Sequence, residues 1–201
     1  MSVLKDPPKM KIFLAAYAKT PELIERGTEA LWRGYENGVL GAPDILSEDF
    51  PMTDTNYYAR EMGENLVKRY LSFPAHLEPQ KLVEIKHLAM EIERTLSEDG
   101  KRRVNLDPGY VFAGGLVLST GKFSLHRLYL GGGVWGELSL GFANGEFLAL
   151  PWSYRDYLRP EVRSRLMEMR KAYLRAERPG ARDVADGAGQ KSTSKPRGQH
   201  T

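Results

Sequence analysis

One short string of the sequence carries three side chains able to act on a ligand. Residues 105–110 read Asn-Leu-Asp-Pro-Gly-Tyr, which places an amide, a carboxylate and a phenol at Asn105, Asp107 and Tyr110. The apolar residues around Leu106 predict a strand, and strand ends commonly present polar groups to ligands. The alternative is structural, because an Asp before Pro-Gly caps its own turn. We therefore expect a turn at Asp107 and keep Asn105, Asp107 and Tyr110 as candidate ligand-binding residues.

A second group of polar side chains is formed by Lys122, His126 and Arg127. His126 is suited to act as a general base, and with either cation it would form a clamp for a phosphate or an oxyanion. The alternative is a half-buried histidine bonded to a backbone carbonyl. If residues 125–130 form a strand, its alternation puts His126 and Arg127 on opposite faces.

Two further places carry candidate residues. Asp54 and Glu61 are two helical turns apart, a spacing that suits an acid–base pair or Mg²⁺ ligands, although a loop and a short surface helix would also explain them. Lys86 follows Ile85 at the edge of an apolar helical stripe, where it is expected to reach solvent or pair with an acid.

Several chemistries lack their motifs. The chain has no cysteine and no closely spaced histidine pair, so it predicts no zinc, haem or iron–sulfur site. Five residues separate Gly115 from Gly121 where a phosphate loop has four, and Phe123 replaces its hydroxyl residue. The G-x-S-x-G elbow and the dinucleotide G-x-G-x-x-G are also missing.

The net charge of +3 gives a pI of about 9.0, but the charge is unevenly spread. Residues 176–201 hold five basic and three acidic residues and only Val184 as a bulky aliphatic, so we predict a disordered, mildly basic tail. The remaining residues, 1–175, are nearly neutral and predict a single domain. No apolar run approaches the roughly 20 residues of a membrane span, and no secretory signal begins the sequence. We expect a cytoplasmic protein without a membrane partner.

The elements that position the candidate residues follow from apolar periodicity. Strands are expected at residues 10–18, 45–50, 66–73 and 104–106, with helices starting at Thr20-Pro21 and at Pro79. This β-α-β-β-α-β order is that of ferredoxin-like domains. Strands at 125–130, 134–140 and 146–150, joined by glycine-rich hairpin signals, predict an antiparallel meander, and a helix from Pro160 follows. The predicted fold class is α+β.

Several strings occur together in one order: Tyr57-Tyr58-x-x-Glu61-Met62-Gly63, Leu82-Val83-Glu84-Ile85-Lys86, Arg102-Arg103-Val104-Asn105-Leu106-Asp107-Pro108-Gly109-Tyr110, His126-Arg127-x-Tyr129-Leu130-Gly131 and Pro151-Trp152-x-Tyr154-x-Asp156-Tyr157. Over about residues 10–175 the chain resembles the bacterial domain of unknown function 4416 family. The resemblance assigns no catalytic role. Its strings are richer in polar residues than packing requires, which favours a shared ligand cleft.

Three functions compete. In the first, the candidate residues line one cleft that binds an anionic small molecule or a nucleotide phosphate, with or without Mg²⁺. In the second, an RRM-like sheet stacks RNA bases on aromatic residues such as Tyr17 and Tyr70. In the third, the polar strings only cap turns of a structural or partner-binding protein. The aromatic residues Trp152, Tyr154 and Tyr157 are suited to stack on a base or a sugar, but we expect them to cover the sheet edge and the last helix. We favour the small-molecule hypothesis.

Overall fold

The strand at Met10–Ala18 (β1) is the centre of the protein. The computed structural model describes residues 1–52 and 59–177, and every residue of β1 is buried. Alternate side chains point to opposite sides, so that Leu14 packs in one hydrophobic core and Phe13 in another. The apolar run is therefore a strand covered on both faces, as its composition predicted.

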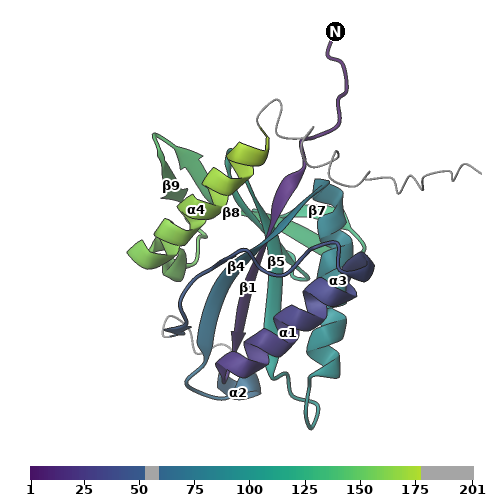
Figure 1. The fold of residues 1–201 in the computed structure, drawn as a ribbon, viewed down its shortest axis with the longest axis vertical. Helices are drawn as coiled ribbons and strands as arrows, with labels where there is room; N and C mark the ends of the chain where they lie inside the picture. Colours follow the sequence, from purple (N-terminus) through teal and green to yellow (C-terminus); the bar gives the residue numbers. More distant parts are fainter. Residues whose placement is uncertain (53–58, 178–201) are drawn as a thin grey trace, which may run out of the picture.

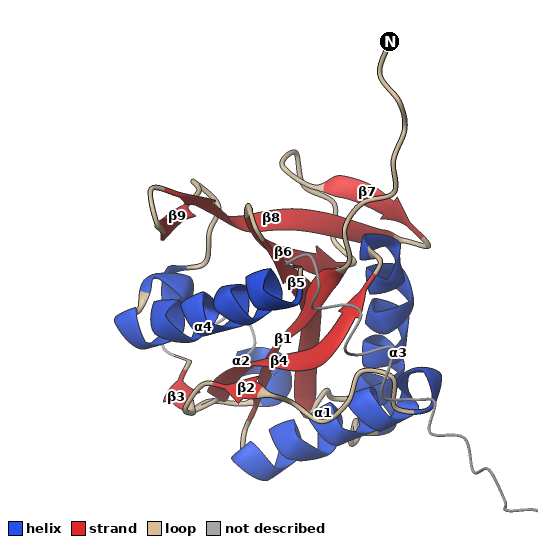
Figure 2. Cartoon of the chain, turned by 45° about the horizontal axis from the view of Figure 1, so that its top comes forward, coloured by secondary structure: helices blue, strands red, loops and turns tan. Residues whose placement is uncertain are grey.

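The described strands form one nine-stranded antiparallel sheet (Figure 2). Its main path runs β2-β4-β1-β5-β6-β8-β7, with β3 added to β4 and β9 to β8. The strands are β2 (Ile45–Leu46), β3 (Phe50–Pro51), β4 (Val67–Leu77), β5 (Val104–Phe112), β6 (Gly115–Thr120), β7 (Leu128–Gly131), β8 (Val134–Ala143) and β9 (Glu146–Ala149). The strand expected at residues 45–50 is thus two short strands, both paired with β4.

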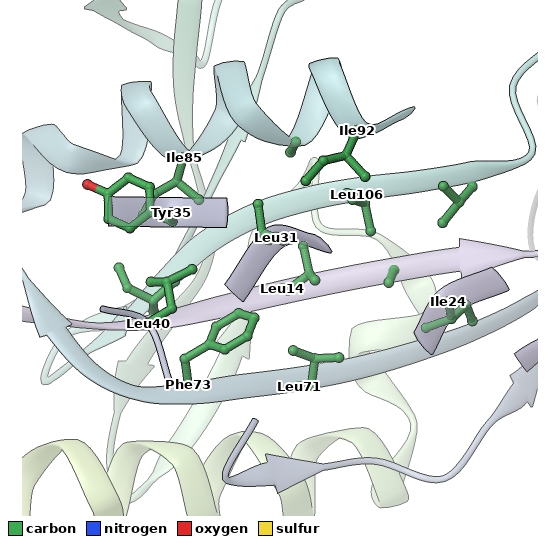
Figure 3. Close-up of a cluster of buried hydrophobic side chains, with 14 of the residues drawn as sticks. Leu14, Ile24, Leu31, Tyr35, Leu40, Leu71, Phe73, Ile85, Ile92 and Leu106 are labelled. Carbon is green, nitrogen blue, oxygen red and sulfur yellow. The ribbon is translucent and has the colours of Figure 1, made fainter. Parts of the chain in front are cut away.

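Helices cover the central strands on both faces (Figure 1). Helices α1 (Pro21–Gly34) and α3 (Leu82–Thr95) bury Leu31 and Ile85 against β1, β4 and β5, and Figure 3 shows this core. Helix α4 (Pro160–Ala176) buries Leu166 and Met169 against the opposite face. A four-residue helix, α2 (Ala59–Met62), precedes β4. The predicted α+β class is confirmed.

Most helix ends and hairpin turns lie where the local sequence signals predict them. Helix α1 begins at Pro21 and is followed by a 3-10 turn that ends at Gly38, whose φ of 91° is left-handed. The hairpin between β8 and β9 turns on Asn144 and Gly145, both with positive φ. These elements are specified by neighbouring residues, which is why the sequence predicts them.

The turn predicted at Asp107 is wrong, because Asp107, Pro108 and Gly109 lie inside β5 and pair with β1. Gly109 is required where β6 crosses closely, since a Cβ atom there would lie 2.2 Å from the carbonyl oxygen of Val117. Pairing with β1 over residues 104–111 keeps the tripeptide extended and outweighs its local turn preference.

The strand predicted at residues 125–130 is also shorter than expected. Strand β7 begins at Leu128, and Leu125 and His126 form a turn before it. The predicted tail from residue 176 lies outside the described residues apart from Ala176, which ends α4, and Glu177. No helix in the described ranges is long and apolar enough to cross a membrane.

Candidate functional site

Strands β5 and β6 separate halfway along β5. They pair only from Gly109, opposite Leu118, to Phe112, opposite Gly115, while β6 pairs with β8 along its whole length. Residues 104–108 of β5 therefore have β1 on one edge and no strand on the other within the described part of the chain. We call this opening between β5 and β6 the fork.

Side chains take the place of the missing strand at the fork. Glu93 Oε1 of α3 accepts the backbone N–H of Leu106 at 2.6 Å, and Lys86 Nζ donates to the Leu106 carbonyl at 3.0 Å. Ser119 Oγ of β6 donates to the Pro108 carbonyl at 2.6 Å. Backbone groups of alternate residues point to the same strand edge, so the nitrogen of Pro108 faces the fork and its missing N–H removes no bond to β1.

The fork opens into a cleft of about 720 Å³. Its walls come from strands β1, β4, β5, β6 and β8, from helix α3 and from residues 152–157, with further residues at Met52, at Arg102 and in the segment between β6 and β7. Because successive side chains of β5 point to opposite faces of the sheet, Asn105 and Asp107 point into this cleft while Leu106 points into the α1/α3 core. Segments that are distant in sequence thus meet where the sheet divides.

A chain of hydrogen bonds runs along one wall. Lys86 Nζ donates to Asp107 Oδ1 at 3.0 Å, and Asn105 Nδ2 donates to Asp107 Oδ2 at 2.8 Å. Arg102 donates to Asn105 Oδ1 at 2.6 Å and holds both Glu61 oxygens, at 3.0 and 2.7 Å. Each amide and carboxylate in this chain is oriented by a cation beside it, so their positions are fixed before any ligand binds.

Burial and pairing shift the titration of this wall. Burial raises the pKa of the Glu93 carboxyl, and the nearby Lys86 charge only partly opposes it. Burial alone would lower the pKa of Arg102, but its bond to Glu61 and the charge of Glu93 raise that pKa above the ordinary value. The bond from Arg102 lowers the pKa of Glu61. Arg102 is therefore a fixed cation at the edge of the cleft.

Near the outer part of the cleft, one carboxylate binds two of the predicted residues. Arg127 Nε donates to Glu137 Oε2 at 2.7 Å, and His126 Nε2 lies 2.9 Å from the same oxygen. The predicted separation of His126 and Arg127 onto opposite faces is wrong, because His126 lies in a turn and not in a strand. The His126 ring also stacks on Trp152, with ring centroids 4.7 Å apart.

The inner end of the cleft contains a buried ion pair surrounded by aromatic rings. Lys68 Nζ lies 2.5 Å from Asp156 Oδ2, and both side chains are 8% exposed. Four tyrosine rings have their centroids 5.0 to 5.9 Å from this ammonium: Tyr17, Tyr70, Tyr154 and Tyr157. The rings are close enough for cation–π attraction, so the lysine is held by its counter-ion and by the aromatic faces.

The structure brings together five of the nine predicted residues on the cleft wall, namely Lys86, Asn105, Asp107, Lys122 and Arg127. Glu61 contacts the wall through Arg102, and His126 lies behind it on Glu137 and Trp152. Tyr110 lies on the other face of β5, against the α1/α3 core, and does not line the cleft. Asp54 lies outside the described residues.

Sequence reasoning missed several wall residues. The cleft is also lined by four charged residues, Lys68, Arg102, Glu137 and Asp156. Three aromatic residues that we expected to cover the sheet edge line it as well: Trp152, Tyr154 and Tyr157. Arg102 had a usable signal, because it stands three residues before Asn105 in the same string. Asp156 stands likewise in the string at residues 151–157, but Lys68 had no such signal, and nothing linked the two because 88 positions separate them. No group of three His, Asp or Glu side chains in the described ranges is placed to hold a metal ion.

Fold and cleft together define an α+β protein whose divided antiparallel sheet holds a charged cleft. The chain belongs to the family described as "Domain of unknown function (DUF4416)", which matches residues 9–173. This confirms the resemblance seen in the sequence, and every residue lining the cleft falls inside the matched range. No curated protein and no solved structure matches the chain.

Proposed function

We propose that the cleft at the fork binds a small anionic molecule. The observation that carries this proposal is the charge of the cleft wall, which has six cationic side chains and four carboxylates among the described residues. Each of these carboxylates contacts one cation of the wall: Asp156 with Lys68, Asp107 with Lys86, Glu93 with Arg102, and Glu137 with Arg127. With Glu61, which binds Arg102 from beside the wall, there are six cations and five carboxylates, so the excess charge is positive and suits a phosphate or a carboxylate.

Aromatic side chains beside these charges favour an anion that also carries a ring. Trp152 is fixed by a hydrogen bond from its Nε1 to the Leu138 carbonyl, and Tyr154 lies two residues on, with about half of its surface exposed. Such faces pack against a sugar or a base, while Lys122 and Arg155 supply positive charge. Nucleotides and sugar phosphates combine the two features.

The RNA-binding alternative has less support. An RRM stacks bases on the sheet face opposite its two helices, and here that face carries Phe13 and Tyr70. Both are fully buried in the core under α4. Base stacking would therefore require α4 to leave the sheet.

We also infer a ferredoxin-like relationship for residues 10–112, and the strand order β2-β4-β1-β5, with α1 and α3 on one face, supports it.

The test is a thermal-shift screen of nucleotides, sugar phosphates and inorganic phosphate, with and without Mg²⁺. A ligand present at 100 times its Kd stabilises the native state by about 2.7 kcal/mol, which raises Tm by about 5–10 °C in a protein of this size. Lys122→Gln removes one positive charge from the wall and should weaken binding. Arg94→Gln makes the same charge change at an exposed position of α3 outside the cleft and is the matched control. The proposal is wrong if no anion raises Tm, or if both substitutions weaken binding equally.

A further inference from the structure

Three buried polar atoms at the inner end of the cleft make no hydrogen bond of good geometry with any of the described residues. They are Tyr70 Oη, Tyr157 Oη and Asp156 Oδ1. Both tyrosines are fully buried, and Asp156 is 6% exposed. Buried polar groups are nearly always hydrogen-bonded, so three such atoms in one place indicate a group that binds there. Asp156 and Tyr157 belong to the cleft wall, so a ligand group can reach this site from the cleft.

The three atoms lie close together. The rings of Tyr70 and Tyr157 stack with centroids 5.1 Å apart, and the charge of Asp156 acts on both phenols. The Tyr70 phenol also lies near enough to the Asp156 carboxylate to interact with it as a donor, although no hydrogen bond of good geometry joins them. Burial, assisted by this charge, raises the pKa of Tyr70 and of Tyr157 well above the ordinary value. Both phenols therefore stay protonated in the native protein and can donate. Asp156 Oδ1 serves as the acceptor, because the other oxygen of this carboxylate pairs with the Lys68 ammonium.

The charge at this end of the cleft is already balanced. Lys68 neutralises Asp156 at 2.5 Å, and aromatic rings surround its ammonium. The other charges that act on the two phenols are of both signs, Arg159 on Tyr70 and Asp107 and Glu137 on Tyr157. A second anion would be repelled by Asp156, and a second cation by Lys68. A neutral hydroxyl fits both needs, because it donates its proton to Asp156 Oδ1 and accepts a proton from a phenol.

We propose that the inner end of the cleft binds an uncharged hydroxyl group of the anionic ligand, held by Asp156, Tyr157 and Tyr70. This inference rests on the proposed function and makes it narrower: the ligand is a hydroxylated anion such as a sugar phosphate, whose phosphate lies nearer the cationic part of the wall. Water has the same hydrogen-bonding chemistry and is the other possible source of the hydroxyl.

The test compares two phosphates of equal charge and ring size, ribose 5-phosphate and tetrahydrofurfuryl phosphate, which lacks the ring hydroxyls. Isothermal titration calorimetry should show that the wild-type protein binds ribose 5-phosphate about 10- to 100-fold more tightly, because its analogue leaves the carboxylate and phenols unpaired. Tyr157→Phe keeps the ring and removes the donor, so it should bring this ratio close to one. Binding of tetrahydrofurfuryl phosphate should not change.

Two further variants complete the test. Tyr70→Phe should also lower the ratio and replaces the first variant if that one fails to fold. Tyr35→Phe removes another buried phenol, which bonds to Glu84 at 3.3 Å outside the cleft, and should leave the ratio unchanged. Equal binding of both phosphates by the wild type overturns the hydroxyl site alone, and a water bound to the three atoms would then be its only occupant. A ratio that survives both cleft variants also overturns it. If neither phosphate nor any other anion binds, the proposed function itself fails.

Discussion

The fork makes a direct prediction about Lys86, which should be important for stability although it is a charged residue on an amphipathic helix. Its side chain is 7% exposed, and its ammonium bonds to the Leu106 carbonyl and to Asp107, both at 3.0 Å. Lys86→Met keeps the length and most of the apolar stem but removes every donor. The substitution leaves the carbonyl and the carboxylate without this partner, while the helix and its apolar stripe remain.

The magnitude follows from these two contacts. Breaking a fully buried ion pair costs about 3–5 kcal/mol, but the Asp107 side chain is 30% exposed, so water compensates part of its loss. Adding the unpaired carbonyl, we expect a loss of about 2–3 kcal/mol in the free energy of unfolding. For a chain of this length the loss corresponds to a Tm lowered by about 4–12 °C.

Urea unfolding followed by tryptophan fluorescence measures this change, and an unchanged m-value would show that the unfolding reaction is the same. Arg94→Met removes a cation from an exposed site on the same helix and should cost less than about 1 kcal/mol. Combining Lys86→Met with Asp107→Asn should cost less than the sum of the two single changes, because they share one contact. A loss below about 0.5 kcal/mol for Lys86→Met would refute the idea that α3 closes the open edge of β5.

Two other predictions concern Gly109 in the sheet and the ion pair between Lys11 of β1 and Asp44, just before β2. Gly109→Ala should destabilise the protein by about 2–4 kcal/mol in thermal unfolding, because the new Cβ atom would lie 2.2 Å from the Val117 carbonyl oxygen. Gly121→Ala is the control and should be nearly neutral, because no atom lies within 4 Å of the position of its Cβ atom. Burial would raise the pKa of Asp44, but its hydrogen bonds from Lys11 and Ser72 outweigh burial and lower this pKa from its ordinary value of 3.8. The ionised Asp44 therefore stabilises the folded protein above pH 3.8, and this stabilisation is lost as pH falls through the lower pKa of the folded state. Asp44→Asn should therefore cost about 1.5–3 kcal/mol in urea unfolding at pH 7 and much less near pH 3, and an equal cost at both pH values would contradict this assignment.

The elements that the sequence predicted are those specified by neighbouring residues. Thr20-Pro21, the apolar stripe of α3 and the glycine turn after β8 each carry their signal within a few positions. The fork could not be predicted in this way, because it depends on where the pairing between β5 and β6 stops, and the two strands are held by β1 and β8 on their other edges. A local reading of Asp-Pro-Gly gives a turn, and only the ladder with β1 makes it a strand.

The candidate site was predictable to a similar extent. Lys86, Asn105 and Asp107 could be selected because each is a polar residue within an apolar pattern. The ion pair of Lys68 and Asp156 could not, since its partners come from β4 and from the segment before α4. The near-neutral charge of residues 1–175 also hid the positive excess, because charges of both signs elsewhere on the surface conceal a local imbalance.

The divided sheet explains much of the string at residues 105–110 without any ligand. Pro108 is tolerated because its nitrogen faces the fork, and Gly109 is needed where β6 crosses. Leu106 and Tyr110 pack against the α1/α3 core.

Once these packing roles are removed, Asn105 and Asp107 are the members of the string that neither the core nor the strand crossing requires. Both point into the cleft, and both are oriented by cations, Arg102 and Lys86, that are themselves anchored to other elements. A polar pair positioned by its neighbours has little rotational freedom left to lose when a ligand binds. The functional signal of the string is therefore its amide and its carboxylate, and its Pro-Gly step belongs to the architecture that opens the cleft.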